Sequence, residues 1–175
     1  MGWVLITYRL PSNDSTARVT VWREVRRSGA LHLQQSVVAF PEGKAFGRVV
    51  DRFREVVGEL GGETLAVRAE PLASADGEKL SDAWNEARSA EYAELTSECL
   101  KFLVEIDHEF EIEKFTLAEL EEEEAELEKL QRWHERVASR DVHSAPGGEE
   151  AREELEQASQ ALARYSAAVF ERTGP

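Results

Sequence analysis

The sequence has 175 residues, of which 42% are hydrophobic and 32% charged, and its formal net charge is −14. This composition is typical of a soluble protein with one domain or two small ones, and no apolar run is long enough to span a membrane. The single cysteine, Cys99, excludes an internal disulfide and a cysteine-built zinc site. Cys99 lies on an apolar helical stripe, which predicts a buried structural thiol.

The first part of the chain alternates strand and helix signals. Residues 3–10 are rich in strand formers and stop at Pro11. A helix follows, with Asp14 or Ser15 as its cap and its end at Ser28-Gly29. The remaining elements of this part are a hairpin over residues 30–40, an amphipathic helix over 43–60 and a strand over 64–70. This βαββαβ order predicts a ferredoxin-like α+β sandwich.

The first strand is apolar on both sides. Trp3 and Leu5 lie on one side, and Val4, Ile6, Tyr8 and Leu10 lie on the other. A ferredoxin-like sheet carries helices on one face only, so something must cover the second face. The candidates are a second copy of the domain, which predicts a homodimer, and the C-terminal helices of the chain itself.

After a linker at residues 74–77, the sequence predicts only helices. Three apolar stripes at helical spacing run over residues 92–110, 117–137 and 151–169, and a turn at 144–148 separates the last two. They predict an antiparallel helical hairpin or three-helix bundle. The acidic run at residues 121–126 is expected to be a solvent-exposed helical face.

Charge divides the chain in the same way. Residues 1–75 contain 10 Lys and Arg against 8 Asp and Glu, whereas residues 76–175 contain 11 against 27. We therefore predict a ferredoxin-like domain at residues 1–73 and an acidic all-helical domain at 74–175, with different partners.

Catalytic and metal-binding signatures are weak. Glu105-Ile-Asp-His108 has the Glu-x-x-His spacing of di-iron bundles, but those sites need two such motifs. His32, His108, His134 and His143 are interpreted as ordinary surface or strand residues. We expect no enzymatic activity, no metal and no cofactor.

Nuclease activity is a separate possibility, because the CRISPR-associated Cas2 proteins resemble this layout. Their first strand ends near an aspartate that holds a metal. Here the strand ends in Tyr8-Arg9-Leu10, and an arginine cannot bind a metal cation. The sequence therefore excludes this activity unless Asp14 substitutes from the loop.

The first helix carries four arginines in ten positions: Arg18, Arg23, Arg26 and Arg27. A helical wheel places Arg23, Arg26 and Arg27 on one outward face. It places Arg18 in the apolar sector, which is formed by Ala17, Val21, Trp22 and Val25. One interpretation is a solvated basic face in which Arg26 and Arg27 interact with the helix dipole. The other is phosphate binding, since arginine pairs bidentately with phosphate oxygens.

Several segments resemble the N-terminal region of the ChrB family of chromate-resistance regulatory proteins. They are Tyr8-Arg9-Leu10-Pro11, residues 15–23 with Gly29-Ala30, Glu91-Tyr-Ala-Glu-Leu95, and residues 115–120 and 130–141. The resemblance implies a bacterial, cytoplasmic, dimeric transcriptional regulator that binds the promoter of a chromate-efflux operon. It also implies that Arg18 and Arg23 contact DNA.

The resemblance covers only the first half of such regulators, which continue into a C-terminal domain credited with chromate sensing. This sequence ends at Pro175, as an excised fragment or a naturally short member would, and in either case the resemblance leaves a chromate response in doubt. The favoured hypothesis is a DNA-binding regulatory module that contacts promoter DNA through the arginine-rich helix. The alternative is a protein-interaction or dimerisation module without DNA binding, which uses the acidic helices.

Overall fold

The computed structural model describes residues 2–11 and 15–174, and the chain divides into two compact units, residues 1–84 and 85–175. Within the described residues there is a four-stranded antiparallel sheet and five helices, which confirms the α+β class. Asp14, named above as a cap and as a metal ligand, lies outside the described residues.

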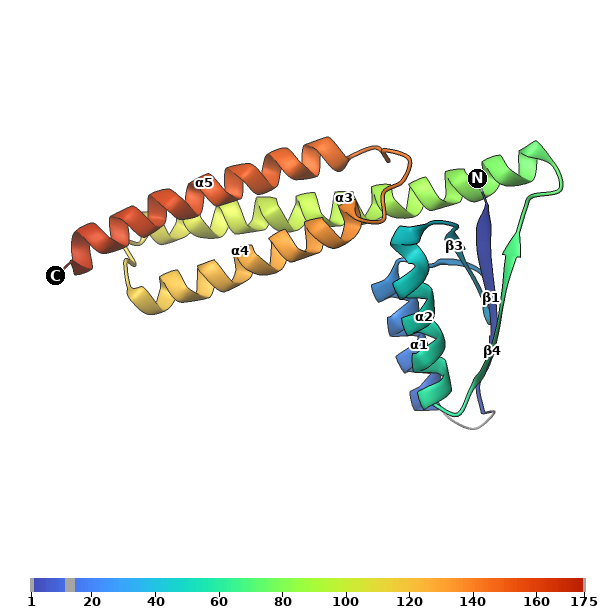
Figure 1. The fold of residues 1–175 in the computed structure, drawn as a ribbon. Coiled ribbons are helices and arrows are strands. Elements are labelled where there is room, and N and C mark those ends of the chain that lie inside the picture. Colours follow the sequence, from blue (N-terminus) through green and yellow to red (C-terminus); the bar gives the residue numbers. More distant parts are fainter. Residues whose placement is uncertain (1, 12–14, 175) are drawn as a thin grey trace. The chain divides into compact units, whose positions relative to one another are not determined.

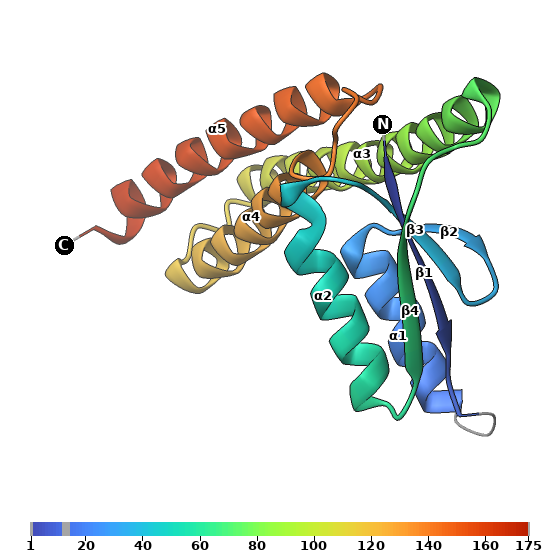
Figure 2. The same cartoon turned by 45° about the vertical axis from the view of Figure 1, so that its right-hand side comes forward.

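Unit 1 contains the sheet, two complete helices and the start of a third (Figure 1). In chain order the strands and the two complete helices are β1 (Trp3–Arg9), α1 (Ser15–Ser28), β2 (Leu31–Gln34), β3 (Val37–Pro41), α2 (Lys44–Glu59) and β4 (Glu63–Ala69). The strands lie in the order β2-β3-β1-β4, and all neighbours are antiparallel. Figure 2 shows α1 and α2 together on one side of this sheet. Each of these elements was predicted from the sequence.

The two faces of the sheet are covered differently. Ile6 of β1 and Phe53 of α2 are fully buried between sheet and helices. On the opposite face Trp3 is 1% exposed, because its ring packs edge-on against Trp84 at 6.1 Å. Leu65 and Val67 of β4 lie across from Thr7 and Leu5 of β1 and are 63% and 44% exposed. Trp84 thus covers Trp3, whereas Leu65 and Val67 of β4 stay exposed.

The predicted linker at residues 74–77 is wrong, because these residues form the first turn of α3 (Ser74–Glu111). Asp76 suits the positive end of the helix dipole and forms an ion pair with Lys79 at 3.6 Å. Leu80 and Trp84 then continue the apolar stripe into the core of unit 1. The division into units therefore falls at Trp84, inside α3, rather than at the start of the helix.

Unit 2 consists of the remainder of α3, α4 (Leu117–Ala138) and α5 (Gly148–Thr173), which run side by side (Figure 1). Thr116 caps α4 by accepting a hydrogen bond from the Glu119 amide at 3.2 Å. The three predicted stripes supply one shared core. Cys99 is fully buried there, and burial raises the pKa of its thiol to about 11, so it is the structural thiol expected.

The acidic run at residues 121–126 is not uniformly exposed. Glu123 is only 3% exposed, although Glu121, Glu122 and Glu124 are exposed as predicted. Glu123 follows Leu120 by three residues and precedes Leu127 by four, so the helical period places it on the buried stripe. Burial first, then the charges of nearby carboxylates such as Glu105, raise the pKa of Glu123 to about 7.

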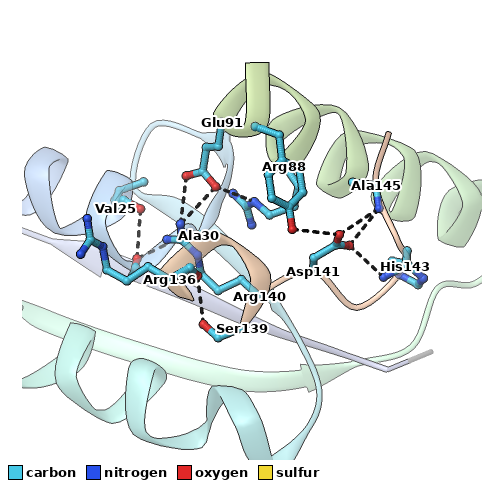
Figure 3. A network of polar contacts seen from close by, with 12 residues as sticks. Val25, Ala30, Arg88, Glu91, Arg136, Ser139, Arg140, Asp141, His143 and Ala145 are labelled. Carbon is cyan, nitrogen blue, oxygen red and sulfur yellow. Dashed lines mark hydrogen bonds and ion pairs between the residues drawn. The ribbon is translucent and has the colours of Figure 1, made fainter. Parts of the chain in front are cut away.

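A polar network lies inside unit 2 (Figure 3). Glu91 forms ion pairs with two guanidiniums: Arg88 Nε lies 2.9 Å and Arg140 Nη2 3.1 Å from Glu91 Oε2. The Arg88 and Arg140 side chains are only 3% and 10% exposed. Next to them, Asp141 accepts from the Tyr92 hydroxyl at 3.2 Å and from the Ala145 amide at 3.0 Å. The network joins α3 to the segment that follows α4.

None of the helices formed by the described residues has the length and hydropathy that a membrane-spanning segment needs.

Candidate nucleic-acid interface

Helix α1 packs through one narrow stripe. Ala17, Val21, Val25 and Ser28, spaced by three or four residues, are buried. The helix ends at Gly29, whose φ is 67°, a left-handed conformation that favours glycine. The Ala30 amide then donates to the Val25 carbonyl at 3.2 Å, which closes the helix end. The stripe leaves most of the helix surface, including every arginine, outside the core.

Trp22 was predicted to be in the buried sector, and this prediction is wrong. Its side chain is 57% exposed, whereas Glu24 is 8% exposed. The buried stripe runs through Val21 and Val25, and Trp22 lies one residue, about 100°, to one side of it. The apolar sector assigned from the sequence was therefore too wide, because it included Trp22 at its edge.

Two arginines flank the exposed indole. Arg18, Trp22 and Arg26 follow each other at four-residue spacing and therefore lie along one side of the helix. The guanidinium carbon of Arg26 lies 5.4 Å from the centre of the Trp22 ring, and Arg18 lines the same cavity as Trp22. An exposed aromatic between two guanidiniums can stack on a base while the cations pair with phosphate.

Arg27 differs from the other three arginines. Its Nε and Nη2 donate to the two Glu24 carboxylate oxygens at 2.9 and 3.0 Å. The Glu24 side chain is only 9% exposed, so this carboxylate is held next to Arg27. Arg27 therefore has an internal counter-charge, which the sequence analysis did not predict. Within residues 2–11 and 15–174, no carboxylate forms an ion pair with Arg18, Arg23 or Arg26.

Helix α2 adds cations that the sequence analysis did not single out. It packs beside α1 and carries Arg48 and Arg54, both exposed and without an ion pair to any described residue. Arg52, in contrast, pairs with Glu55 and Glu59. The signal was present in the net positive charge of residues 1–75, but only the first helix was analysed on a wheel.

The sequence matches the protein family described as Protein ChrB, N-terminal, over residues 18–175. The chain belongs to the ChrB N-terminal family. The resemblance seen in the sequence is thereby confirmed, and it relates the chain to a domain of chromate-resistance regulators. The match to the ChrB family begins at Arg18 and includes all four predicted arginines. No match is found among curated proteins.

The two arginines that the ChrB resemblance singles out occupy different surroundings. Arg18 shares its side of α1 with Trp22, whereas Arg23 comes one residue after Trp22 and four before Arg27, on the other flank. A flat partner surface centred on one of these arginines would leave the other at its edge. A partner that curves around both flanks of α1, as the walls of a DNA groove do, could contact both.

Proposed function

We propose that this chain is a DNA-binding regulatory module whose α1 contacts the promoter of a chromate-resistance operon. The observation that carries the proposal is the exposed set Arg18, Arg23 and Arg26, none of them ion-paired within the described residues, together with the exposed Trp22 that lies between Arg18 and Arg26. Free guanidiniums bind phosphate oxygens bidentately, and an exposed indole adds base stacking. Arg48 and Arg54 are further exposed cations, on the helix α2 that packs beside α1.

The acidic unit 2 is proposed to stay away from the phosphate backbone. Residues 85–175 contain 24 Asp and Glu against 10 Lys and Arg, so DNA is repelled from this part of the chain. The alternative, a protein-interaction module without DNA binding, would use these acidic helices. It predicts complete absence of DNA binding, which separates it from our proposal.

Other parts of the proposal follow from the resemblance to ChrB and from the sequence. We propose a ferredoxin-like fold for unit 1, which the element order and the strand order β2-β3-β1-β4 support. We also propose a bacterial, cytoplasmic homodimer without enzymatic activity, metal or cofactor. The open apolar side chains of Leu65 and Val67, on the edge strand β4, support dimerisation.

The proposal is tested by the salt dependence of DNA binding. Binding to DNA from upstream of the gene should weaken steeply as salt rises, because each phosphate contact releases counterions. Arg23→Ala should lower the slope of log K against log salt concentration by about one unit. A gel-shift or fluorescence-anisotropy titration at four salt concentrations measures it.

The matched control is Arg132→Ala. Arg132 is an exposed arginine on α4 and pairs with Glu128 of the same acidic helix. Its removal should leave the slope unchanged. A slope near zero for the unmodified chain, or equal slopes for the Arg23 and Arg132 variants, would contradict phosphate binding by α1.

Dimerisation has its own test. Multi-angle light scattering at micromolar concentration should give the mass of two chains, and Leu65→Glu with Val67→Glu should give the mass of one. Both side chains are exposed, so the double variant should fold normally. A one-chain mass for the unmodified protein, or an unchanged two-chain mass for the variant, would contradict the proposed interface.

A further inference from the structure

A cavity of about 540 Å³ lies in unit 1 next to the N-terminal half of α1. Its wall combines three successive segments of the chain: the end of β1 with Tyr8 and Leu10, α1 with Arg18 and Trp22, and the β2–β3 hairpin with His32. The volume is in the range of small-molecule sites. Convergence of three segments makes it a formed concavity rather than a feature of one helix.

The fixed charges of the cavity are of one sign. Arg9 and Arg18 line it together with the His32 imidazole, which can donate a hydrogen bond, and the described lining residues include no aspartate or glutamate. Arg9 has a partner, since its Nη2 lies 2.9 Å from Glu63 Oε2, but both side chains are more than three-quarters exposed and the pair is weak. Arg18 has no ion pair with a described residue. The cavity therefore attracts an anion.

The cavity also has an aromatic wall. The Trp22 ring is 57% exposed, and Tyr8 is held edge-on against Phe53 with ring centres 5.6 Å apart. Leu10 and Pro11 add aliphatic surface. Inorganic phosphate would touch only the cationic part of this lining. A planar ring attached to the anion would also cover the indole and remove apolar surface from water.

The backbone at the cavity is fixed before any ligand binds. The Tyr8 amide donates to the Ser36 carbonyl at 2.9 Å, which ties β1 to the turn of the hairpin. Ser36 has a φ of 65°, a left-handed conformation that is costly for a residue other than glycine. A left-handed residue is common in a tight hairpin turn, so this conformation belongs to the β2–β3 turn itself.

We propose that this cavity binds a small organic anion in which a planar ring packs against Trp22 and a phosphate or carboxylate group pairs with Arg18 and His32. Both anionic groups accept the parallel hydrogen bonds that a guanidinium offers. This site goes beyond the proposed DNA contact. Because Arg18 and Trp22 belong to both surfaces, a bound anion would compete with DNA for them.

Isothermal titration calorimetry of the full chain tests the site with four probes: adenosine monophosphate, benzoate, adenosine and inorganic phosphate. At least one of the two ring-bearing anions should bind with a Kd below about 1 mM. That compound should bind at least about tenfold more tightly than adenosine, which has a ring but no anionic group, and than inorganic phosphate, which has no ring. Comparison of the two anions tells a phosphate from a carboxylate ligand. Absence of binding by both, or equal binding of inorganic phosphate, overturns the proposal.

Two variants locate the site. Arg18→Gln and Trp22→Leu should each raise the Kd for the anion by about tenfold or more. The first substitution removes the charged hydrogen-bond donors, and the second removes the ring on which the ligand stacks. Both side chains are exposed, so the fold should be retained, and circular dichroism checks this. Unchanged affinity in either variant contradicts the site.

Arg23→Ala separates this inference from the proposed function. Arg23 does not line the cavity, so its removal should lower the salt slope of DNA binding but keep the affinity for the anion. Anion binding without any DNA binding contradicts the proposed function alone. DNA binding without anion binding contradicts the inference alone.

Discussion

Replacing Glu91 by alanine is expected to lower the free energy of unfolding by about 3–5 kcal/mol, because it breaks a buried ion-pair network from its centre. Arg88 and Arg140 both point at this carboxylate, at 2.9 and 3.1 Å, and both are nearly enclosed (Figure 3). Removal of the Glu91 carboxylate takes away the negative charge that both buried guanidiniums share, so their mutual repulsion is no longer offset there. Urea unfolding followed by circular dichroism measures the change.

The control is Glu94→Ala, one turn further along α3. Glu94 is exposed, so its loss should change the stability by less than about 0.5 kcal/mol. If the Glu91 and Glu94 variants unfold at the same urea concentration, the network does not stabilise the fold. The variant in which Glu91 becomes glutamine should fall between them, since an amide still accepts hydrogen bonds but carries no charge.

Replacing Glu123 by glutamine is expected to stabilise the protein at pH 8 by about 2 kcal/mol and to have a much smaller effect at pH 5. The folded state raises the pKa of Glu123 from 4.5 to about 7. The stability that the protonated Glu123 carboxyl contributes is therefore fully present below pH 4.5. It is lost as the pH rises through 7, because the buried carboxyl then ionises in the folded state. Glutamine cannot ionise and avoids this loss. Unfolding free energies at pH 5, 6, 7 and 8 measure the difference.

The neighbouring Glu124 supplies the matched control. It is exposed and belongs to the same acidic run, so Glu124→Gln should shift the stability equally at every pH. The quantity to compare is the difference between each variant and the unmodified chain, because other groups titrate in the same range. A Glu123 difference that does not grow between pH 5 and pH 8 would contradict the raised pKa.

The elements of unit 1 could be predicted because their ends carry strong signals. Pro11 and Pro41 stop strands, Gly29 stops α1, and the apolar positions follow periods of two or nearly four. The first turn of α3 was missed for the opposite reason. Asp76-Gly77 is a common turn dipeptide, and only the buried positions of Leu80 and Trp84 show that the helix has already begun.

The site was predicted in part. The sequence identified the arginines of α1, but the exposure of Trp22 and the pairing of Arg27 with Glu24 depend on which side of α1 packs against the rest of unit 1. A wheel of one helix does not contain that information. The cavity depends on how β1, α1 and the hairpin pack together, which no single element shows. The burial of Glu123 was not predicted because glutamate was assumed to be exposed, although its spacing from Leu120 and Leu127 places it on the buried stripe.

The enclosed thiol of Cys99 has a practical consequence. With its pKa raised to about 11 and no exposed surface, it should resist alkylation at neutral pH, and it is the one cysteine of the sequence. A second cysteine introduced at the exposed Val19 of α1 would then react alone with a maleimide dye. The natural chain is thus ready for a site-specific fluorescent reporter on this helix, without first removing its own sulfur.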